Sequence, residues 1–260
     1  MQTLIVPLDG SEGAERALPT VAVLARGSGA AVIVLTAEIG GVVEHPLEYL
    51  DRAARAAGID DPQTLVVKGQ FAATAIATTA KTAADPVVCM ATHARSGWRR
   101  ALFSSVAEET LQAVEAPVLL VGPHVGDAAP APSLVVVCTD GSPAAQAILQ
   151  TAGATAAALG LDVVVITVAA GAEAEAATAE VERVAAEFAA QGVTARGEVV
   201  DATDAPGAIV EYVRDRPGAI LALATHGRTG LARITVGSVT MAVVADAPVP
   251  VLTVRPSHLG

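Results

Sequence analysis

The stretch from Thr225 to Ser238, THGRTGLARITVGS, brings together residue types that bind anions. Gly227 and Gly230 allow the backbone to approach a ligand closely and to turn its N–H groups toward negative charge. Gly237 and Ser238 lie where the next helix is expected to begin, and a helix N-terminus attracts phosphate. The stretch therefore predicts a phosphate-binding loop.

The basic side chains of this loop are open to more than one interpretation. Arg228 and Arg233 could pair with a phosphate, or they could point into water. His226 has no Asp or Ser partner nearby in the sequence, which favours packing within the loop over catalysis.

A second polar turn, Asp140-Gly141-Ser142, follows the apolar run LVVVCT. Ser142 suits the N-cap of a helix, Pro143 suits its first position, and Gly141 suits a tight turn. Asp140 has two interpretations. Its carboxylate could accept hydrogen bonds from the base or ribose of a nucleotide, or it could stabilise the turn itself.

Both features have counterparts earlier in the chain, which indicates an internal repeat. LIVPLDGS near the N-terminus matches VVVCTDGS, so Asp9 corresponds to Asp140. ATHARSG matches ATHGRTG, so Ala91 corresponds to Ala224. Because the landmarks recur in the same order and spacing, we interpret the chain as two copies of one domain.

The two copies are separated by a segment rich in Pro, Gly and Ala that has no periodicity. We expect a first domain over residues 1–122, a linker over residues 123–133 and a second domain over residues 134–257.

Within the second copy, apolar runs typical of strands alternate with Ala-rich stretches typical of helices. The strand runs are LVVVCT, DVVVITV, ARGEVV, AILALA and VPVLTV, and helices are expected over residues 142–159, 173–191, 206–216 and 237–246. Runs that are apolar throughout predict strands buried on both faces. The fold class is therefore α/β, with two tandem, open, twisted, parallel five-stranded sheets covered by helices on both faces. Ligands of such sheets bind beyond the carboxyl ends of the strands.

Composition and missing motifs exclude several classes of function. The net charge of −11 opposes a general attraction to DNA, RNA or anionic membranes. No leader-like or membrane-length apolar segment is evident, so we expect a cytoplasmic protein. The chain has neither a P-loop nor a GxGxxG turn after a strand. Cys89 and Cys138 lie at apolar runs without a CxxC pair, which favours two buried cysteines over a disulfide or metal site.

The tandem DGS turns, the loop ATHGRTGLARITVGS and the closing PVLTVRP resemble the universal stress protein family in its two-domain form, over essentially the whole chain. The ATP-binding pattern of this family is Gly, two residues, Gly, nine residues, then Gly followed by Ser or Thr. In the second copy it falls on Ala224, Gly227, Gly237 and Ser238, with Ala224 in place of the first glycine.

This resemblance implies a Rossmann-like, adenine-nucleotide α-hydrolase-like fold that binds ATP together with Mg²⁺. It implies that Asp140 and Val168 surround adenine and ribose. It also implies that Gly227, Gly237, Ser238 and the amide of Val239 contact the phosphates, beside the second loop glycine, Gly230.

The first copy departs further from the family pattern. Its corresponding positions are Ala91, Ala94, Ser104 and Ser105, and Ala37 replaces the residue that matches Val168. Side chains in place of glycine crowd a phosphate path, although nearby arginines add positive charge. We therefore expect nucleotide mainly in the second copy, with Asp9, Ser104 and Ser105 as weaker candidates.

The sequence shows no nucleophile with an activating partner and no metal cluster. We expect a nucleotide-binding stress-response regulator that is not an enzyme, with at most slow ATP hydrolysis by a positioned water. A tandem interaction scaffold without nucleotide stays open, since Ala224 and the first copy depart from the motif. An adenine-nucleotide-dependent enzyme is a weaker alternative.

The resemblance also implies a mode of assembly. Members of the family pair through their last strands, so the two copies are expected to pair within one chain as a pseudo-dimer, which protects both strand edges. Pro248 and Pro250 near the last strand suit such an edge. A homodimer of whole chains stays open.

Overall fold

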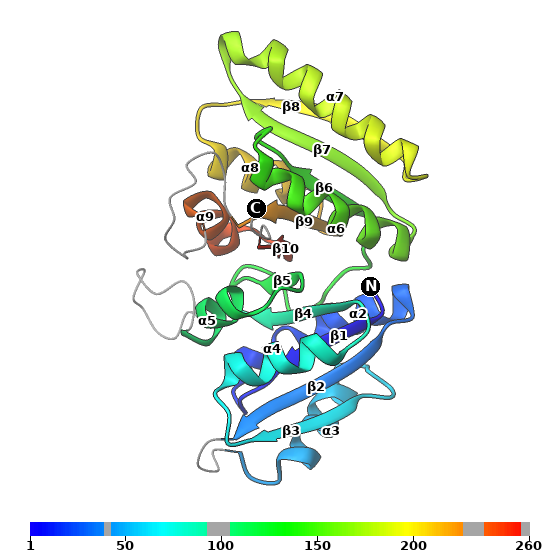
Figure 1. The fold of residues 1–260 in the computed structure, drawn as a ribbon, viewed down its shortest axis with the longest axis vertical. Coiled ribbons are helices and arrows are strands. Elements are labelled where there is room, and N and C mark those ends of the chain that lie inside the picture. The colour runs from blue at the N-terminus through cyan, green and yellow to red at the C-terminus, as the bar shows by residue number, and fades with distance from the viewer. Residues whose placement is uncertain (39–42, 93–104, 226–236, 256–260) are drawn as a thin grey trace.

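The structure is a computed structural model that describes residues 1–38, 43–92, 105–225 and 237–255. Strands and helices alternate along both halves (Figure 1). The first half contains β1 (Thr3–Pro7), α1 (Glu12–Glu15), α2 (Leu18–Ser28), β2 (Ala31–Glu38), α3 (Pro46–Ala56), β3 (Gln63–Lys68), α4 (Ala72–Thr82), β4 (Pro86–Ala91), α5 (Ser105–Ala113) and β5 (Val118–Val121). The second half contains β6 (Leu134–Cys138), α6 (Pro143–Leu159), β7 (Asp162–Ala169), the 3₁₀ turn η1 (Gly171–Glu173), α7 (Ala174–Ala190), β8 (Ala195–Asp201), α8 (Ala205–Arg214), β9 (Ala219–Ala224), α9 (Ser238–Asp246) and β10 (Val251–Val254).

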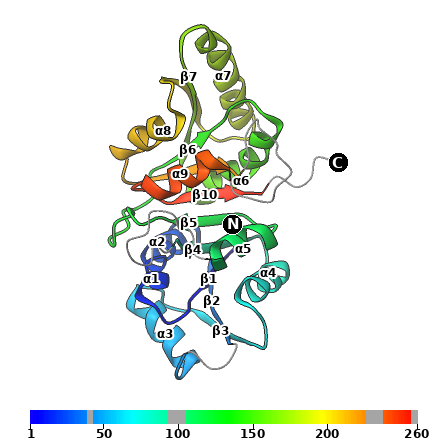
Figure 2. The same ribbon diagram turned by 90° about the vertical axis from the view of Figure 1, so that its left-hand side faces the viewer.

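The strands form one continuous ten-stranded sheet in the order β3-β2-β1-β4-β5-β10-β9-β6-β7-β8. Pairing is parallel within each half and antiparallel between β5 and β10, where Leu252 lies opposite Leu119. The predicted α/β class with two parallel five-stranded sheets is confirmed, and so is the pairing of the two last strands within the chain. Figure 2 shows β5 and β10 side by side between the halves.

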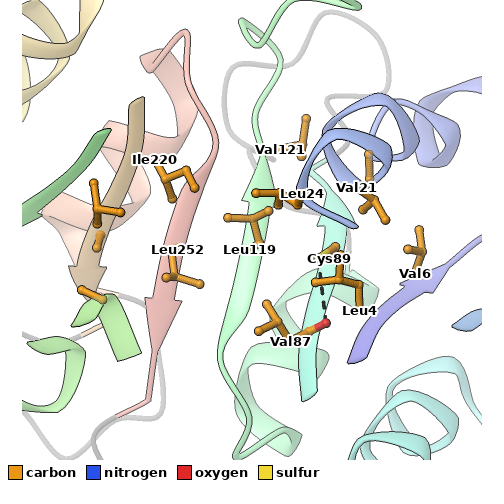
Figure 3. Close-up of a cluster of buried hydrophobic side chains, with 14 of the residues drawn as sticks. Leu4, Val6, Val21, Leu24, Val87, Cys89, Leu119, Val121, Ile220 and Leu252 are labelled. Carbon is orange, nitrogen blue, oxygen red and sulfur yellow. Dashed lines mark hydrogen bonds between the residues drawn. The ribbon is translucent and has the colours of Figure 1, made fainter. Parts of the chain in front are cut away.

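Helices cover both faces of the sheet and bury a separate apolar cluster on each. One cluster lies under α1, α2, α3, α6 and α7, and the other under α4, α5, α8 and α9. Neighbouring residues of a strand point to opposite faces, so Leu119 joins the first cluster and Leu120 the second. Figure 3 shows Leu119 and Leu252 from the two halves in the same cluster. The predicted burial on both faces is confirmed for the inner strands, but it is wrong for the outermost strands β3 and β8, which have no buried residue because each has a neighbouring strand on one side only.

The segment expected to be the linker contains no helix or strand and is fixed to both halves. In the first half, Arg16 Nη2 donates to the carbonyl oxygens of Pro123 and Val125, at 3.0 Å each. The Val125 side chain is buried in the first cluster. In the second half, the Ser133 amide donates to the Gly218 carbonyl at 2.9 Å. The segment is therefore held to the first half near its start and to the second half at its end.

None of the helices in the described part of the chain is both long enough and apolar enough to span a membrane.

We expect Gly122→Ala to weaken the contact between the halves. A Cβ atom at Gly122 would lie 2.3 Å from the carbonyl oxygen of Val244 on α9, so the backbone of one half must shift. The expected loss is about 1–3 kcal/mol of unfolding free energy, measured by urea denaturation. Gly126→Ala, four residues further along the chain, is the matched control, because a Cβ there meets nothing within 4 Å. Equal stability of the two variants would contradict the close packing at Gly122.

We expect Thr253→Val to stabilise the protein. Thr253 lies on β10 with its side chain fully buried, and its hydroxyl has no hydrogen-bond partner in the described part of the chain. The first half has Leu120 at this position. Valine keeps the shape and removes the desolvated hydroxyl, so thermal denaturation should report a gain of about 1 kcal/mol. Thr155→Val is the control, because its hydroxyl bonds to the Thr151 carbonyl at 2.9 Å. A similar gain there would trace the effect to hydrophobicity alone.

Candidate functional site

A cavity of about 300 Å³ lies at the carboxyl ends of β6, β7 and β9. Every predicted main binding residue that the structure describes lines it, and these residues are Asp140, Val168, Ala224, Gly237, Ser238 and Val239. They come from four separate elements or their adjoining turns. The structure therefore brings together side chains that are nearly a hundred positions apart in the sequence.

Several residues of the prediction lie outside the described residues. These are Gly227, Gly230, Arg228 and Arg233 of the second half, and Ser104 of the first. Their predicted roles stay predictions.

One end of the cavity has apolar walls. Ile166 and Val168 from β7 and Ile209 from α8 line it, and each of them belongs to or packs against the second cluster. The hydroxyl of Thr167 donates to the Thr139 carbonyl at 2.8 Å, which fixes β7 to the turn after β6. An apolar slot beside a fixed polar turn suits a flat heteroaromatic ring.

Asp140 serves its turn and also lines the cavity, while its predicted role toward a nucleotide stays a prediction. Its Oδ1 accepts a hydrogen bond from the Ser142 amide at 3.0 Å. Gly141 has a φ of 73°, and Ser142 caps α6 by accepting from the Ala145 amide at 3.2 Å. The predicted N-cap and glycine turn are confirmed. They hold the half-buried carboxylate at the edge of the cavity.

The other end of the cavity is the start of α9. Gly237 is the N-cap and has no side chain to cover the first amides, and the first turn carries no acidic residue. Ser238 and Val239 follow and are both exposed. No described side chain caps this helix, and the start of a helix carries partial positive charge, so this side of the cavity suits an anion. The prediction that α9 begins here is confirmed.

Asp140 is the single charged side chain among the described residues that line the cavity. Attraction for an anion within this set therefore comes from the backbone of α9 and the Ser238 hydroxyl, with no lysine or arginine contributing.

Sequence reasoning missed Cys138, Thr139 and Thr240, together with the apolar lining residues Ala145, Ile166, Ala205, Ile209 and Leu223. Cys138 was expected to be buried, but it is only partly buried because it ends β6 at the cavity wall. Cys138 lies two residues before Asp140, at the end of the strand run, and this place in the sequence could have indicated that it borders the cavity. Cys89 is completely buried in β4, as predicted.

The corresponding turn of the first half is built on the same plan, with Gly10 at a φ of 84°. Asp9 Oδ1 accepts from both the amide and the hydroxyl of Ser11, at 3.0 and 2.6 Å. Ser11 also accepts from the Ala14 amide as the N-cap of α1. Ser105 begins α5, as Ser238 begins α9. Asp9 therefore follows β1 as Asp140 follows β6, and Ser105 has the position in α5 that Ser238 has in α9.

The profile of the universal stress protein family matches residues 40–122 and residues 134–255. A search of curated protein sequences found no significant match. A universal stress protein from Archaeoglobus fulgidus is 18% identical, with 97% of this chain and 96% of that one covered and a TM-score of 0.68. A putative universal stress protein from Pseudomonas aeruginosa is 17% identical over 98% and 94%, with a TM-score of 0.67. A universal stress protein in complex with cAMP is 27% identical, but covers only 46% of this chain and 95% of its own, with a TM-score of 0.39.

We expect the two cysteines to react differently with methyl methanethiosulfonate. Cys138 faces the cavity and should be modified in the folded protein, whereas Cys89 should react only after unfolding. Burial raises the pKa of both thiols, that of Cys89 to about 12. The thiolate is the nucleophile, so labelling of Cys138 should be slow at neutral pH and accelerate as the pH rises. Mass spectrometry of peptides measures both rates, and equal protection of the two would contradict the open cavity wall.

Proposed function

The chain belongs to the universal stress protein family, and we propose that its second half binds ATP with Mg²⁺ and that the bound nucleotide regulates the protein. In this proposal the chain is a cytoplasmic stress-response regulator, and its partner is ATP or another adenine nucleotide, not a nucleic acid or a membrane.

The observation that carries the proposal is the chemistry of the cavity at the carboxyl ends of β6, β7 and β9. An apolar wall lies on the β7 side, a carboxylate follows β6, and a helix start that no described side chain caps lies on the β9 side. Its volume of about 300 Å³ is at the lower limit for sites that enclose small molecules. This order of apolar, acidic and electropositive groups matches the base, ribose and phosphate of a nucleotide.

Each part of the ligand has a residue that suits it. Val168 packs against the adenine ring, and Asp140 accepts hydrogen bonds from the base or the ribose hydroxyls. The amides of Ser238 and Val239, beside Gly237, donate to phosphate oxygens. The methyl group of Ala224, where the family pattern has glycine, lines the same cavity.

Mg²⁺ fits the charge balance of this site. Asp140 adds negative charge among the described lining residues, so a triphosphate needs neutralisation from elsewhere. The exposed Ser238 hydroxyl beside the phosphates is an oxygen donor of the kind that Mg²⁺ accepts. When bound, the ion neutralises phosphate charge and fixes the phosphates' orientation.

The structure in complex with cAMP resembles too small a part of this chain for its ligand to count as support. The proposal therefore rests on the cavity itself. A scaffold role without nucleotide is the second candidate, and the observation that favours it is Ala224 in place of the first motif glycine.

The first test is the ligand content of the purified protein. Denaturation followed by chromatography and mass spectrometry should release about one adenine nucleotide per chain, and calorimetry of the stripped protein should detect Mg-ATP binding. Gly237→Val should lower the affinity by about a hundredfold or more, because the side chain blocks the approach of phosphate to the first amides of α9. Gly237 has a φ of −58°, which valine also adopts, so the fold should persist.

Gly126→Val is the matched control, because a Cβ there meets nothing within 4 Å and Gly126 does not line the cavity. It should bind Mg-ATP as the unmodified protein does. Unchanged affinity in a folded Gly237→Val variant would remove the start of α9 as the phosphate site. A protein that contains no nucleotide and ignores Mg-ATP would support the scaffold.

A further inference from the structure

Thr240 ties the first turn of α9 to the end of β9. It is the third residue of the helix, its side chain is 3% exposed, and its hydroxyl donates to the carbonyl oxygen of Ala224 at 2.9 Å. Ala224 is the last residue of β9 and lines the cavity together with Thr240. The bond therefore connects two walls of the same cavity.

A second bond fixes the helix start from the other side. The amide of Gly237 donates to the Thr225 carbonyl at 2.5 Å. Thr225 is itself held to β10, because its amide and its hydroxyl both donate to the Val254 carbonyl, at 3.2 and 3.3 Å. The position of the first turn of α9 is thus set by the sheet, through bonds that bracket the residues whose amides border the cavity.

The first half has only part of this arrangement. Thr92 corresponds to Thr225 and donates in the same way to the Val121 carbonyl, through its amide at 2.9 Å and its hydroxyl at 3.4 Å. On the helix side, however, Ala107 of α5 stands where α9 has Thr240, and a methyl group cannot donate. The hydrogen bond from a helix hydroxyl to the end of the neighbouring strand is therefore specific to the half that keeps Gly237, the last glycine of the motif.

We propose that Thr240 is a positioning residue that holds the amides of Ser238 and Val239 in the orientation that meets a phosphate. A donor that is already fixed costs less free energy to order when the ligand binds. The hydroxyl of Thr240 donates to the Ala224 carbonyl, so in this proposal it affects binding by holding the helix start. The inference rests on the proposed nucleotide site and names the side chain that prepares it.

The experiment compares Mg-ATP with adenosine, which has no phosphate, by calorimetry on the full chain. Thr240→Val keeps the shape of the side chain and removes the donor, while Thr240→Ser keeps the donor. Thr240→Val should weaken Mg-ATP about tenfold, the effect of one lost hydrogen bond, and leave adenosine unchanged. Thr240→Ser should restore most of the Mg-ATP affinity. Equal loss of both ligands, or of neither in a folded variant, would overturn the proposal.

Hydrogen exchange separates this proposal from the nucleotide proposal. The Met241 amide makes the first bond within α9, to the Gly237 carbonyl at 2.9 Å. Without ligand, its exchange should be faster in Thr240→Val than in the unmodified protein, and Thr240→Ser should resemble the latter. If the unmodified protein binds neither ligand, the nucleotide proposal fails. The exchange rate still tests whether the bond between Thr240 and Ala224 holds the helix start. An unchanged exchange rate in Thr240→Val would refute the positioning role by itself.

Discussion

The antiparallel pairing of β5 with β10 is the interaction on which the rest of the structure depends. Each strand is short and apolar, and each would be an open edge if its half stood alone. Pairing them supplies backbone partners to both and places Leu119 and Leu252 in one cluster. We call this paired boundary between the two halves the seam, and Arg255 extends it by donating to the Gln112 carbonyl on α5. Two domain-sized sheets thereby become one.

The seam also places the candidate site. Helix α9 packs so closely on the first half that Gly122 has no space for a side chain beside the Val244 carbonyl. The N-terminal end of the same helix forms the electropositive wall of the cavity. One nine-residue helix therefore connects the interface of the two halves with the site. Because the helix is closely packed, a displacement of one end of α9 would displace the other.

The two halves show how a duplicated scaffold keeps its structure while its sites diverge. The turn after the first strand is the same in both, with a serine N-cap and a glycine at positive φ, because the strand-to-helix connection requires them. The cavity-facing positions are less constrained. The first half has Ala37 and Ala107 where the second has Val168 and Thr240. The residues that the turn needs for folding are thus common to both halves, whereas these residues at the cavity differ between them.

The sequence by itself determined the repeat, the order of strands and helices, the cap at Ser142 and the start of α9 at Ser238, because these follow from local periodicity and turn chemistry. It also placed Asp140 and Gly237 at one edge of the sheet, since parallel strands share their carboxyl ends. Only the tertiary structure decided that Cys138 and Thr139 line the cavity, and that the hydroxyl of Thr240 reaches the Ala224 carbonyl. Such contacts join residues that the order of the strands brings together. Local sequence patterns do not determine the distances between side chains that are far apart in the chain.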